Sequence, residues 1–393
     1  MAKLGELGKI ITGNTPKTSD AQNYRSNDIC FVKPSDFTDN EITEIHQSEF
    51  YISEYAKDKA RVLPTDSILV TCIGIIGKVA INKVPCAFNQ QINAIIPVNA
   101  IIPERKICDP RYVAYAIQNV QPQMQNTANA AVVPILNKTQ FSNIEIPLPS
   151  LETQKQIVEF LDKVTSLISL RKQQLAKLDE LVKARFVEMF GDMLLNSLGW
   201  SEKPLECLAD IVSGITKGRK TTETDLQEVP YMAVSNVKNG YIDWTTVKTI
   251  LATRQEMEQY RLLPGDILMT EGGDPDKVGR GAIIKNPLEN SIHQNHIFRV
   301  RLDKSELLPS FFAEYLQHQK AKRYFLGCAK QTTGIASINM RQLKSLPVLL
   351  PPLSLQNEFA AFVERVEQQK QTVQRSLEKL KLMKKALMQE YFG

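Results

Sequence analysis

Apolar residues recur in a four-three pattern along two long stretches of the chain, residues 151–190 and 353–392. Neither stretch contains Gly or Pro, and both are rich in Leu, Lys, Glu and Gln, which is typical of uninterrupted helices. A 3.5-residue repeat sustained over this length predicts the seam of a coiled coil, because the stripe of an ordinary surface helix repeats every 3.6 residues. The seam positions of the first stretch are Ile157, Leu161, Val164, Ile168, Leu175, Leu178 and Val182. Each helix would be roughly 60 Å long at ~1.5 Å per residue, and each is the natural partner of the other.

The second stretch repeats the seam 202 residues later, with Lys370 and Lys384 in place of Ile168 and Val182. Arg171 in the first stretch corresponds to Val373 in the second, so each helix interrupts its seam near the middle. Such interruptions can fix the register of the pair. Proline-rich segments precede both stretches, and Ser150 and Ser354 are the expected N-caps.

The remainder of the chain is also written twice. Seven segments recur in the same order, at offsets between 199 and 204 residues. Gly13 pairs with Gly214, Ser35 with Ser235, Gly77-Lys78 with Gly279-Arg280, and Gln90-Gln91 with Gln294-Asn295. Two copies of one unit of about 200 residues predict an internal pseudo-dimer with approximate two-fold symmetry.

The expected fold class is therefore α+β, with two repeated α/β domains at opposite ends of an antiparallel two-helix coiled coil. The expected boundaries are residues 1–150 and 192–352 for the two globular domains, and 151–191 and 353–393 for the helices. The alternative is a pair of amphipathic helices buried in separate cores.

Composition narrows the class of protein. Hydrophobic residues make up 43% and charged residues 23%, as in ordinary globular proteins, and a net charge of +5 permits a nucleic-acid partner without requiring one. The six cysteines form no CxxC pair, so neither a zinc site nor a disulfide framework is indicated. No signal peptide and no apolar run of membrane-spanning length is present, and the expected location is the cytoplasm.

Catalytic signatures are missing from the sequence. There is no GxGxxG after a strand, no Walker loop, and no Asn/Asp-Pro-Pro-aromatic motif of amino-methyltransferases. Asp266, Asp274, Asp276 and Lys277 lie close together, yet no Asp/Glu-x-Lys triplet follows them, which argues against a nuclease. His293 and His296 lack a third metal ligand. We expect no catalytic residues, no metal and no cofactor.

The junctions between the globular domains and the helices carry a resemblance. The segments IPLPSLETQKQIVEFLDKV (146–164) and LPPLSLQNEFAAFVERV (350–366) each place a Gln, Gln154 or Gln356, at the start of the helix. Together with the repeat, which covers essentially the whole chain, they resemble the specificity subunit of type I restriction–modification enzymes. The first half departs from the second in lacking a leader like Asp192–Lys203.

The resemblance implies a non-catalytic subunit that binds double-stranded DNA. Each globular domain would be a target-recognition domain that reads one half of a split, asymmetric site. The helices would separate the halves and dock two methyltransferase subunits, to which restriction–translocation subunits attach.

The internal repeat suggests which residues read DNA. Domains that read different bases should share a scaffold and differ in their loops, here residues 14–28 against 215–229 and 72–78 against 271–280. Arg and Lys suit phosphates and guanine, whereas Asn and Gln suit adenine. The candidate DNA-binding residues are Lys17, Arg25, Lys33, Lys78, Gln90, Gln91, Lys217, Arg219, Lys220, Lys277, Arg280, Gln294 and Asn295.

A second class of function fits the same pattern. A coiled coil carrying two globular domains can be a non-enzymatic adaptor that holds two protein partners apart. Such an adaptor needs no base discrimination, so a DNA-binding assay separates the two hypotheses.

Overall fold

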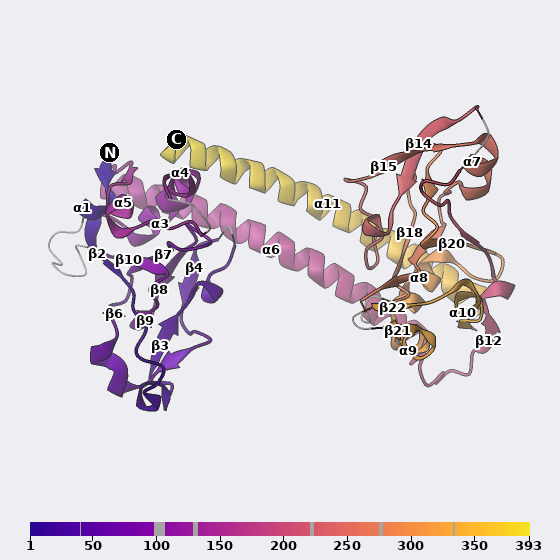
Figure 1. Cartoon of the computed structure of the whole chain (residues 1–393), viewed down its shortest axis with the longest axis horizontal. Coiled ribbons are helices and arrows are strands. Elements are labelled where there is room, and N and C mark those ends of the chain that lie inside the picture. Colours follow the sequence, from indigo (N-terminus) through magenta and orange to yellow (C-terminus); the bar gives the residue numbers. More distant parts are fainter. Residues whose placement is uncertain (40, 98–106, 129–132, 221–223, 275–277, 333–334) are drawn as a thin grey trace. The chain divides into compact units, whose positions relative to one another are not determined.

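A computed structural model describes the chain except for residues 40, 98–106, 129–132, 221–223, 275–277 and 333–334 (Figure 1). The described residues form two compact units. Unit 1 comprises residues 1–172 and 375–393, and unit 2 comprises residues 173–374. Each unit contains one globular part and a portion of each long helix, α6 (Leu151–Phe190) and α11 (Leu353–Phe392).

The globular part of unit 1 is built on two sheets. The larger has the order β2 (Gly8–Thr12), β10 (Ile92–Pro97), β7 (Ile68–Thr71), β8 (Val79–Asn82), β4 (Thr43–Ile45). The smaller has the order β5 (Tyr51–Ile52), β3 (Ile29–Val32), β9 (Cys86–Phe88), β6 (Val62–Leu63). Three short 3₁₀ segments, η1 (Ala21–Tyr24), η2 (Pro34–Asp36) and η3 (Glu54–Lys59), connect these strands.

The larger sheet of unit 1 is buried on both faces. Leu69, Ala80 and Ala94 pack against the smaller sheet, in one hydrophobic cluster with Val32 and Phe88. Ile68, Val70, Val79, Ile81 and Ile95 belong to a second cluster, formed with the helices. Burial on both faces explains why these strands read as continuous apolar runs and do not alternate.

Helices cover the outer face of this sheet. They are α1 (Leu4–Leu7), α3 (Pro110–Asn119), α4 (Gln121–Thr127) and α5 (Lys138–Ser142). Asp109 caps α3, since its carboxylate accepts hydrogen bonds from the backbone N–H of Arg111 and Tyr112 at 2.8 and 3.1 Å. Pro110 occupies the first turn, as the sequence predicts.

Unit 2 repeats this plan. Its main sheet has the order β13 (Ala209–Ser213), β20 (Ile297–Leu302), β16 (Ile267–Thr270), β18 (Gly281–Ile283). A second sheet has the order β15 (Lys248–Ala252), β14 (Gln227–Met232), β19 (Ile292–His293), and a third has β17 (Gly272–Gly273), β22 (Ile335–Ser337), β21 (Lys330–Thr332). The helical elements of its globular part are η4 (Leu205–Cys207), η5 (Val234–Asn236), α7 (Arg254–Tyr260), α8 (Pro309–Gln317), α9 (Gln319–Cys328) and α10 (Met340–Lys344).

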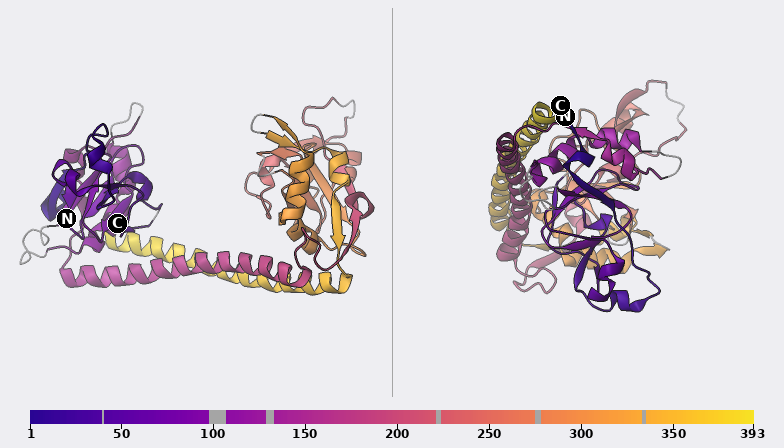
Figure 2. Two further views of the ribbon diagram at one scale, coloured as in Figure 1. Left: turned by 90° about the horizontal axis from the view of Figure 1, so that it is seen from below. Right: turned by 90° about the vertical axis from the view of Figure 1, so that its left-hand side faces the viewer.

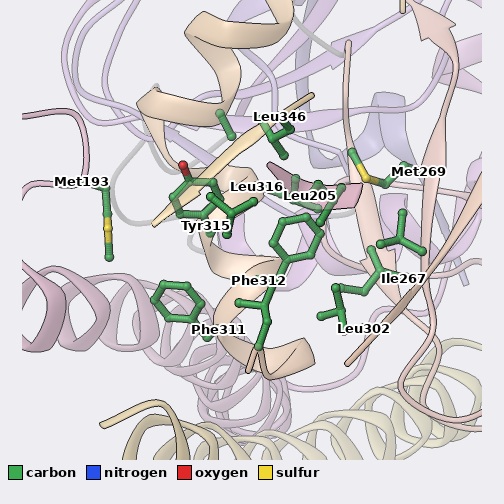
Figure 3. Packing of buried hydrophobic residues seen from close by; sticks show 14 of the residues in the cluster. Met193, Leu205, Ile267, Met269, Leu302, Phe311, Phe312, Tyr315, Leu316 and Leu346 are labelled. Carbon is green, nitrogen blue, oxygen red and sulfur yellow. The ribbon is translucent and has the colours of Figure 1, made fainter. Parts of the chain in front are cut away.

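Helix α8 supplies the centre of the unit 2 core. Phe311, Phe312 and Tyr315 are fully buried, and they lie among residues of the main sheet such as Ile267 and Leu302 (Figure 3). The ring of Phe311 also packs against Phe186 and Phe190 of α6, with centroids 5.4 and 4.8 Å apart. The core therefore attaches the globular part to its portion of the long helix.

Backbone hydrogen bonds confirm the repeat and correct one of its pairings. Asn14 N–H donates to Phe88 O at 3.0 Å, and Ile215 N–H donates to His293 O at 2.9 Å, so His293 is equivalent to Phe88. It follows that Gln90 corresponds to Asn295 and Gln91 to His296. The pairing of Gln90-Gln91 with Gln294-Asn295 made from the sequence is thus wrong by one residue. It matched neighbouring Gln and Asn residues by their similar side chains, whereas the backbone hydrogen bonds set a register one residue further along.

Only the end of the leader of the second half, the strand that begins at Ser201, has a counterpart in unit 1. Strand β12 (Ser201–Pro204) pairs with β23 (Pro347–Leu350), and in unit 1 the short strand β1 (Ala2–Lys3) pairs in the same antiparallel way with β11 (Glu145–Ile146). The two globular parts are therefore attached to their helices through the same kind of strand pair.

The two long helices run antiparallel within each unit, side by side in both views of Figure 2. In unit 2, Phe186 packs on Phe359 with centroids 5.5 Å apart, while Asp179 lies 2.7 Å from the Lys370 ammonium. In unit 1, the Lys384 ammonium lies 5.8 Å from the ring of Tyr115, whose hydroxyl donates to Asp162. Residue numbers that rise on one helix fall on the other, as expected.

The predicted seam is buried as expected, but only one of the two N-caps expected from the sequence is correct. All first-copy seam residues are buried except the half-buried Leu175. Ser150 caps α6, since its hydroxyl accepts from Thr153 N–H at 3.2 Å. Ser354 is not the cap of α11, because the helix begins at Leu353 and its first turn is bonded to the Pro352 carbonyl.

Candidate nucleic-acid interface

Two parallel strands bring several candidate residues of unit 1 together. Strands β3 and β9 run parallel, and Asn89 N–H donates to Val32 O at 3.1 Å. The residues that follow these strands, Lys33 and Asn89–Gln91, therefore share one edge, which we call the carboxyl edge of unit 1. The Thr15 hydroxyl donates to Gln90 Oε1 at 2.7 Å, so the loop after β2 also meets this edge.

Close backbone approach makes this junction depend on glycine. A Cβ atom on Gly13 would lie 2.1 Å from Asn89 O, and one on Gly214 would lie 2.0 Å from His293 O. The match of Gly13 with Gly214 is thus a scaffold feature, as the sequence comparison suggests.

The basic residues of unit 1 differ in how they are held. The Lys33 ammonium lies 3.1 Å from the centroid of the Phe50 ring, a contact that keeps the cation at the edge. Lys78 is mostly buried and pairs with Asp39 at 2.6 Å. Lys17 and Arg25 are exposed in the loop before β3.

The equivalent carboxyl edge of unit 2 consists of Ala233 and Gln294–His296. Strands β14 and β19 are parallel, and Gln294 N–H donates to Met232 O at 3.0 Å. Gln294 Oε1 accepts from Val234 N–H at 3.4 Å, which gives this side chain a scaffold role. Asn295 is half-buried, and its backbone N–H donates to Ile215 O at 3.0 Å.

The basic loop of unit 2 is only partly available. Lys217 and Lys220 are exposed, but Arg219 makes two hydrogen bonds to the Glu256 carboxylate and one to Leu251 O. The hydrogen bonds from Arg219 hold the pKa of Glu256 below its ordinary value. The sequence did not indicate this pair, because its members lie on different elements.

Two further candidates lie near strand β18. Arg280 is half-buried and its carbonyl accepts from Thr270 N–H at 3.1 Å, as the carbonyl of Lys78 accepts from Thr71 N–H at 3.0 Å. The pairing of Lys78 with Arg280 is thus confirmed as a structural equivalence. Lys277 lies outside the described residues.

The histidines and cysteines take other roles. His293 is buried, with its ring nitrogens 3.2 Å from Tyr260 O and 3.3 Å from Val212 O, and burial lowers its pKa to about 4. Burial raises the pKa of Cys72 to about 11 and of Cys86 to about 12, so both thiols stay protonated at neutral pH. Within the described part of the chain, no group of three or more His, Cys, Asp or Glu is arranged to hold a metal ion.

Gln154 and Gln356, noted in the sequence only for their resemblance, have a clear structural task. Both are fully buried. Gln356 Oε1 accepts from Leu308 N–H at 2.9 Å, and its Nε2 donates to Pro351 O and Glu306 O at 2.9 and 3.0 Å. Gln154 makes the same three bonds with Asp109, Pro149 and Ile107. Each Gln thus ties the start of a long helix to the start of α3 or α8.

No helix among the described residues is both long and apolar enough to cross a membrane.

Comparisons with known proteins agree on one family. Residues 1–180 and 198–382 each match the type I restriction modification DNA specificity domain. The chain is 23% identical to the EcoKI specificity subunit of Escherichia coli K12 over 390 residues, 94% of this chain and 81% of that protein. It is 25% identical to the StySPI specificity subunit of Salmonella potsdam over 388 residues, 93% of this chain and 81% of that protein.

The fold is similar to a solved one. The S subunit of the type I restriction–modification system from M. genitalium aligns over 100% of this chain and 95% of its own, at 14% identity and a TM-score of 0.58. The family domain matches the chain twice, once over each copy of the internal repeat. The chain belongs to the family of type I restriction modification DNA specificity domains.

Proposed function

We propose that this chain is the subunit that selects the DNA sequence for a type I restriction–modification complex. In this proposal, residues 1–150 and 192–352 are two target-recognition domains, and residues 151–191 and 353–393 are the helices that space them. Each domain reads one half of a split, asymmetric site in double-stranded DNA. The family match, which occurs once over each half of the chain, supports this assignment.

The observation that carries the proposal is that the two units have the same backbone arrangement at their carboxyl edges but different side chains on it. The two carboxyl edges have matching ladder hydrogen bonds, yet Lys33 stands where unit 2 has Ala233, and Gln90 stands where it has Asn295. A shared scaffold with different edge side chains is what two readers of different base sequences need, because base edges are distinguished by donor and acceptor patterns.

The basic residues fit a supporting task. Lys17, Arg25, Lys217 and Lys220 are exposed on the segments that lead from β2 to β3 and from β13 to β14, where they can contact phosphates. Phosphate contacts contribute affinity and salt dependence without sequence information. Gln90, which is exposed, and Asn295 are the stronger candidates for contacts with bases, whereas Gln91 Oε1 already accepts from Asn89 Nδ2 at 2.9 Å.

The long helices are proposed to dock two methyltransferase subunits, with restriction–translocation subunits attached through them. Exposed apolar residues on the helices support a protein partner. On the unit 1 part of α6 and α11 they are Phe160, Leu167, Leu170, Leu382 and Met383. We propose that the isolated chain neither methylates nor cuts DNA, and that methyl transfer appears only when a cognate methyltransferase subunit is added.

The test is a binding selection from a random-sequence DNA library by the chain assembled with its methyltransferase subunits, run at two salt concentrations. A split consensus that persists at the higher salt concentration supports the proposal. Binding that has no consensus and disappears with salt contradicts it, and leaves the alternative of an adaptor that holds two protein partners.

A further inference from the structure

Glu271 and His296 form a hydrogen-bonded pair in unit 2, and neither residue is among the candidate readers named from the sequence. His296 Nδ1 lies 2.6 Å from Glu271 Oε2, and the side chains remain 57% and 35% exposed. His296 is the last residue of the carboxyl edge, and Glu271 directly follows strand β16. The pair therefore lies at the end of the carboxyl edge of unit 2.

The backbone holds this pair firmly. Glu271 N–H donates to His296 O at 3.0 Å, and Ile338 N–H donates to Glu271 O at 2.8 Å. The two residues also line an open hollow of about 400 Å³ with Val234, Gly272 and Ser337. A polar pair fixed at the wall of a hollow can receive part of a ligand without a large rearrangement.

Unit 1 has the same backbone and different chemistry at this place. Cys72 N–H donates to Gln91 O at 2.7 Å, and Leu136 N–H donates to Cys72 O at 2.9 Å. Cys72 is thus the equivalent of Glu271, and Gln91 the equivalent of His296. The bridge between Ile73 and Ile135 likewise replaces the pairing of Gly272 with Ser337.

The comparison argues against a scaffold role for the side chains of Glu271 and His296. Unit 1 builds the same hydrogen-bond ladder with a thiol and an amide, so the ladder does not need the carboxylate or the imidazole. A carboxylate on an edge that faces phosphates is unfavourable unless it makes a specific contact. The side chains at this position differ between the two units while the backbone hydrogen bonds are the same, as expected of a position that selects a base.

We infer that Glu271 and His296 read an exocyclic amino group in the major groove, either adenine N6 or cytosine N4. This inference rests on the proposed function. With the proton of Nδ1 donated to Glu271 Oε2, the free carboxylate oxygen and Nε2 are both acceptors. Amino groups are the donors that adenine and cytosine present in the major groove, whereas guanine and thymine present acceptors there.

The experiment uses the full chain assembled with its methyltransferase subunits. Binding selection on a library with randomised half-sites is run for wild type, Glu271→Gln, and the control Glu289→Gln, an exposed carboxylate elsewhere in unit 2. Wild type is expected to require adenine or cytosine at one position of one half-site. Glu271→Gln should lose that preference by about tenfold, within the range of one base contact, while the control keeps it.

A second arm removes the amino group from the DNA. Purine replaces adenine, or 2-pyrimidinone replaces cytosine, at the assigned position. Wild type should bind the altered site about tenfold more weakly, and Glu271→Gln should bind both sites equally, as one base contact predicts. The two replacements also tell the adenine contact from the cytosine contact.

Several outcomes overturn the inference. They are that Glu271→Gln binds with the wild-type consensus at every position, that it weakens binding to all sequences equally, or that it responds to amino-group removal as wild type does. Each of these results would leave the split consensus of wild type in place. Loss of a consensus in wild type itself would instead contradict the proposed function.

Discussion

At the scale of single residues, His293 shows how the two units solve one packing problem differently. It occupies the place of Phe88 in unit 1, and both side chains are fully buried. A neutral imidazole has one N–H, so it can donate to only one of the two carbonyl oxygens it faces. Burial favours the neutral form and lowers the pKa of His293 to about 4.

This histidine should make unit 2 sensitive to acid. An unfolded His titrates near pH 6.5, so between about pH 6.5 and 4 the unfolded chain binds a proton that the folded chain does not. Stability should therefore fall as the pH is lowered through this window, by on the order of 3 kcal/mol in total. His293→Phe should remove this loss.

The measurement is urea unfolding at pH 7 and pH 5, followed by tryptophan fluorescence. Both tryptophans, Trp200 and Trp244, lie in unit 2, so the signal reports on that unit. His46→Gln, at an exposed histidine in unit 1, is the control. If His293→Phe and wild type lose the same stability between the two pH values, the assignment to His293 is wrong.

Gln356 and Gln154 offer a matched pair of substitutions. Gln356→Ala leaves Leu308 N–H and two carbonyl oxygens without their partners in a buried place. The expected loss of stability is about 2–4 kcal/mol, since an unmet buried polar group costs about 1–3 kcal/mol. The tryptophan transition should move to a lower urea concentration in Gln356→Ala.

Gln154→Ala removes the same three bonds from unit 1, so it should change the circular dichroism transition more than the tryptophan transition. Gln156→Ala, on the exposed face of the same helix, should change neither. Equal effects of all three substitutions on tryptophan fluorescence would contradict the proposed clamp.

At the scale of elements, the sequence predicts the long helices well because one physical rule decides them. A seam of apolar residues without Gly or Pro yields the helix bounds and the buried positions such as Leu161 and Val182. The sheets were predicted only as short strands, since the order β2-β10-β7-β8-β4 depends on pairings between distant segments. The same limit explains the candidate site, where Arg219–Glu256 and Glu271–His296 join residues from different elements.

The apolar face of α6 that points away from the core is expected to bind the methyltransferase subunit. Phe160, Leu167 and Leu170 are 57%, 43% and 58% exposed and lie on one stripe of the helix. Leu167→Lys should weaken association at least about tenfold, or ~1.4 kcal/mol, by placing a charge in an apolar contact. Because the position is exposed, the stability of the chain should change by less than about 0.5 kcal/mol.

Isothermal titration of the methyltransferase subunit into each variant measures this effect. Lys155→Gln, at an exposed position of the same helix that lies off this stripe, is the control. Unchanged affinity of Leu167→Lys, with normal folding, would show that the partner binds elsewhere.

At the scale of the whole molecule, the chain uses one design twice. Equivalent hydrogen bonds build two carboxyl edges, and equivalent glutamines fix two globular parts to the long helices. The sequence predicts this repeat and the family, because the repeated segments keep their order. It does not predict that Gln90 corresponds to Asn295, one residue beyond Gln294, since only the backbone hydrogen bonds distinguish these two neighbouring amide residues.

The central claim is that each unit reads its own half of the DNA site, and one measurement tests it directly. Gln90→Ala and Asn295→Ala change equivalent positions of the two carboxyl edges. Both variants, assembled with methyltransferase subunits, are compared with wild type by binding selection on a library that covers the whole split site. Gln90→Ala should change base preference within one half-site only, and Asn295→Ala within the other only, each by about tenfold. Changes that fall in the same half-site, or that spread over both, would contradict the account.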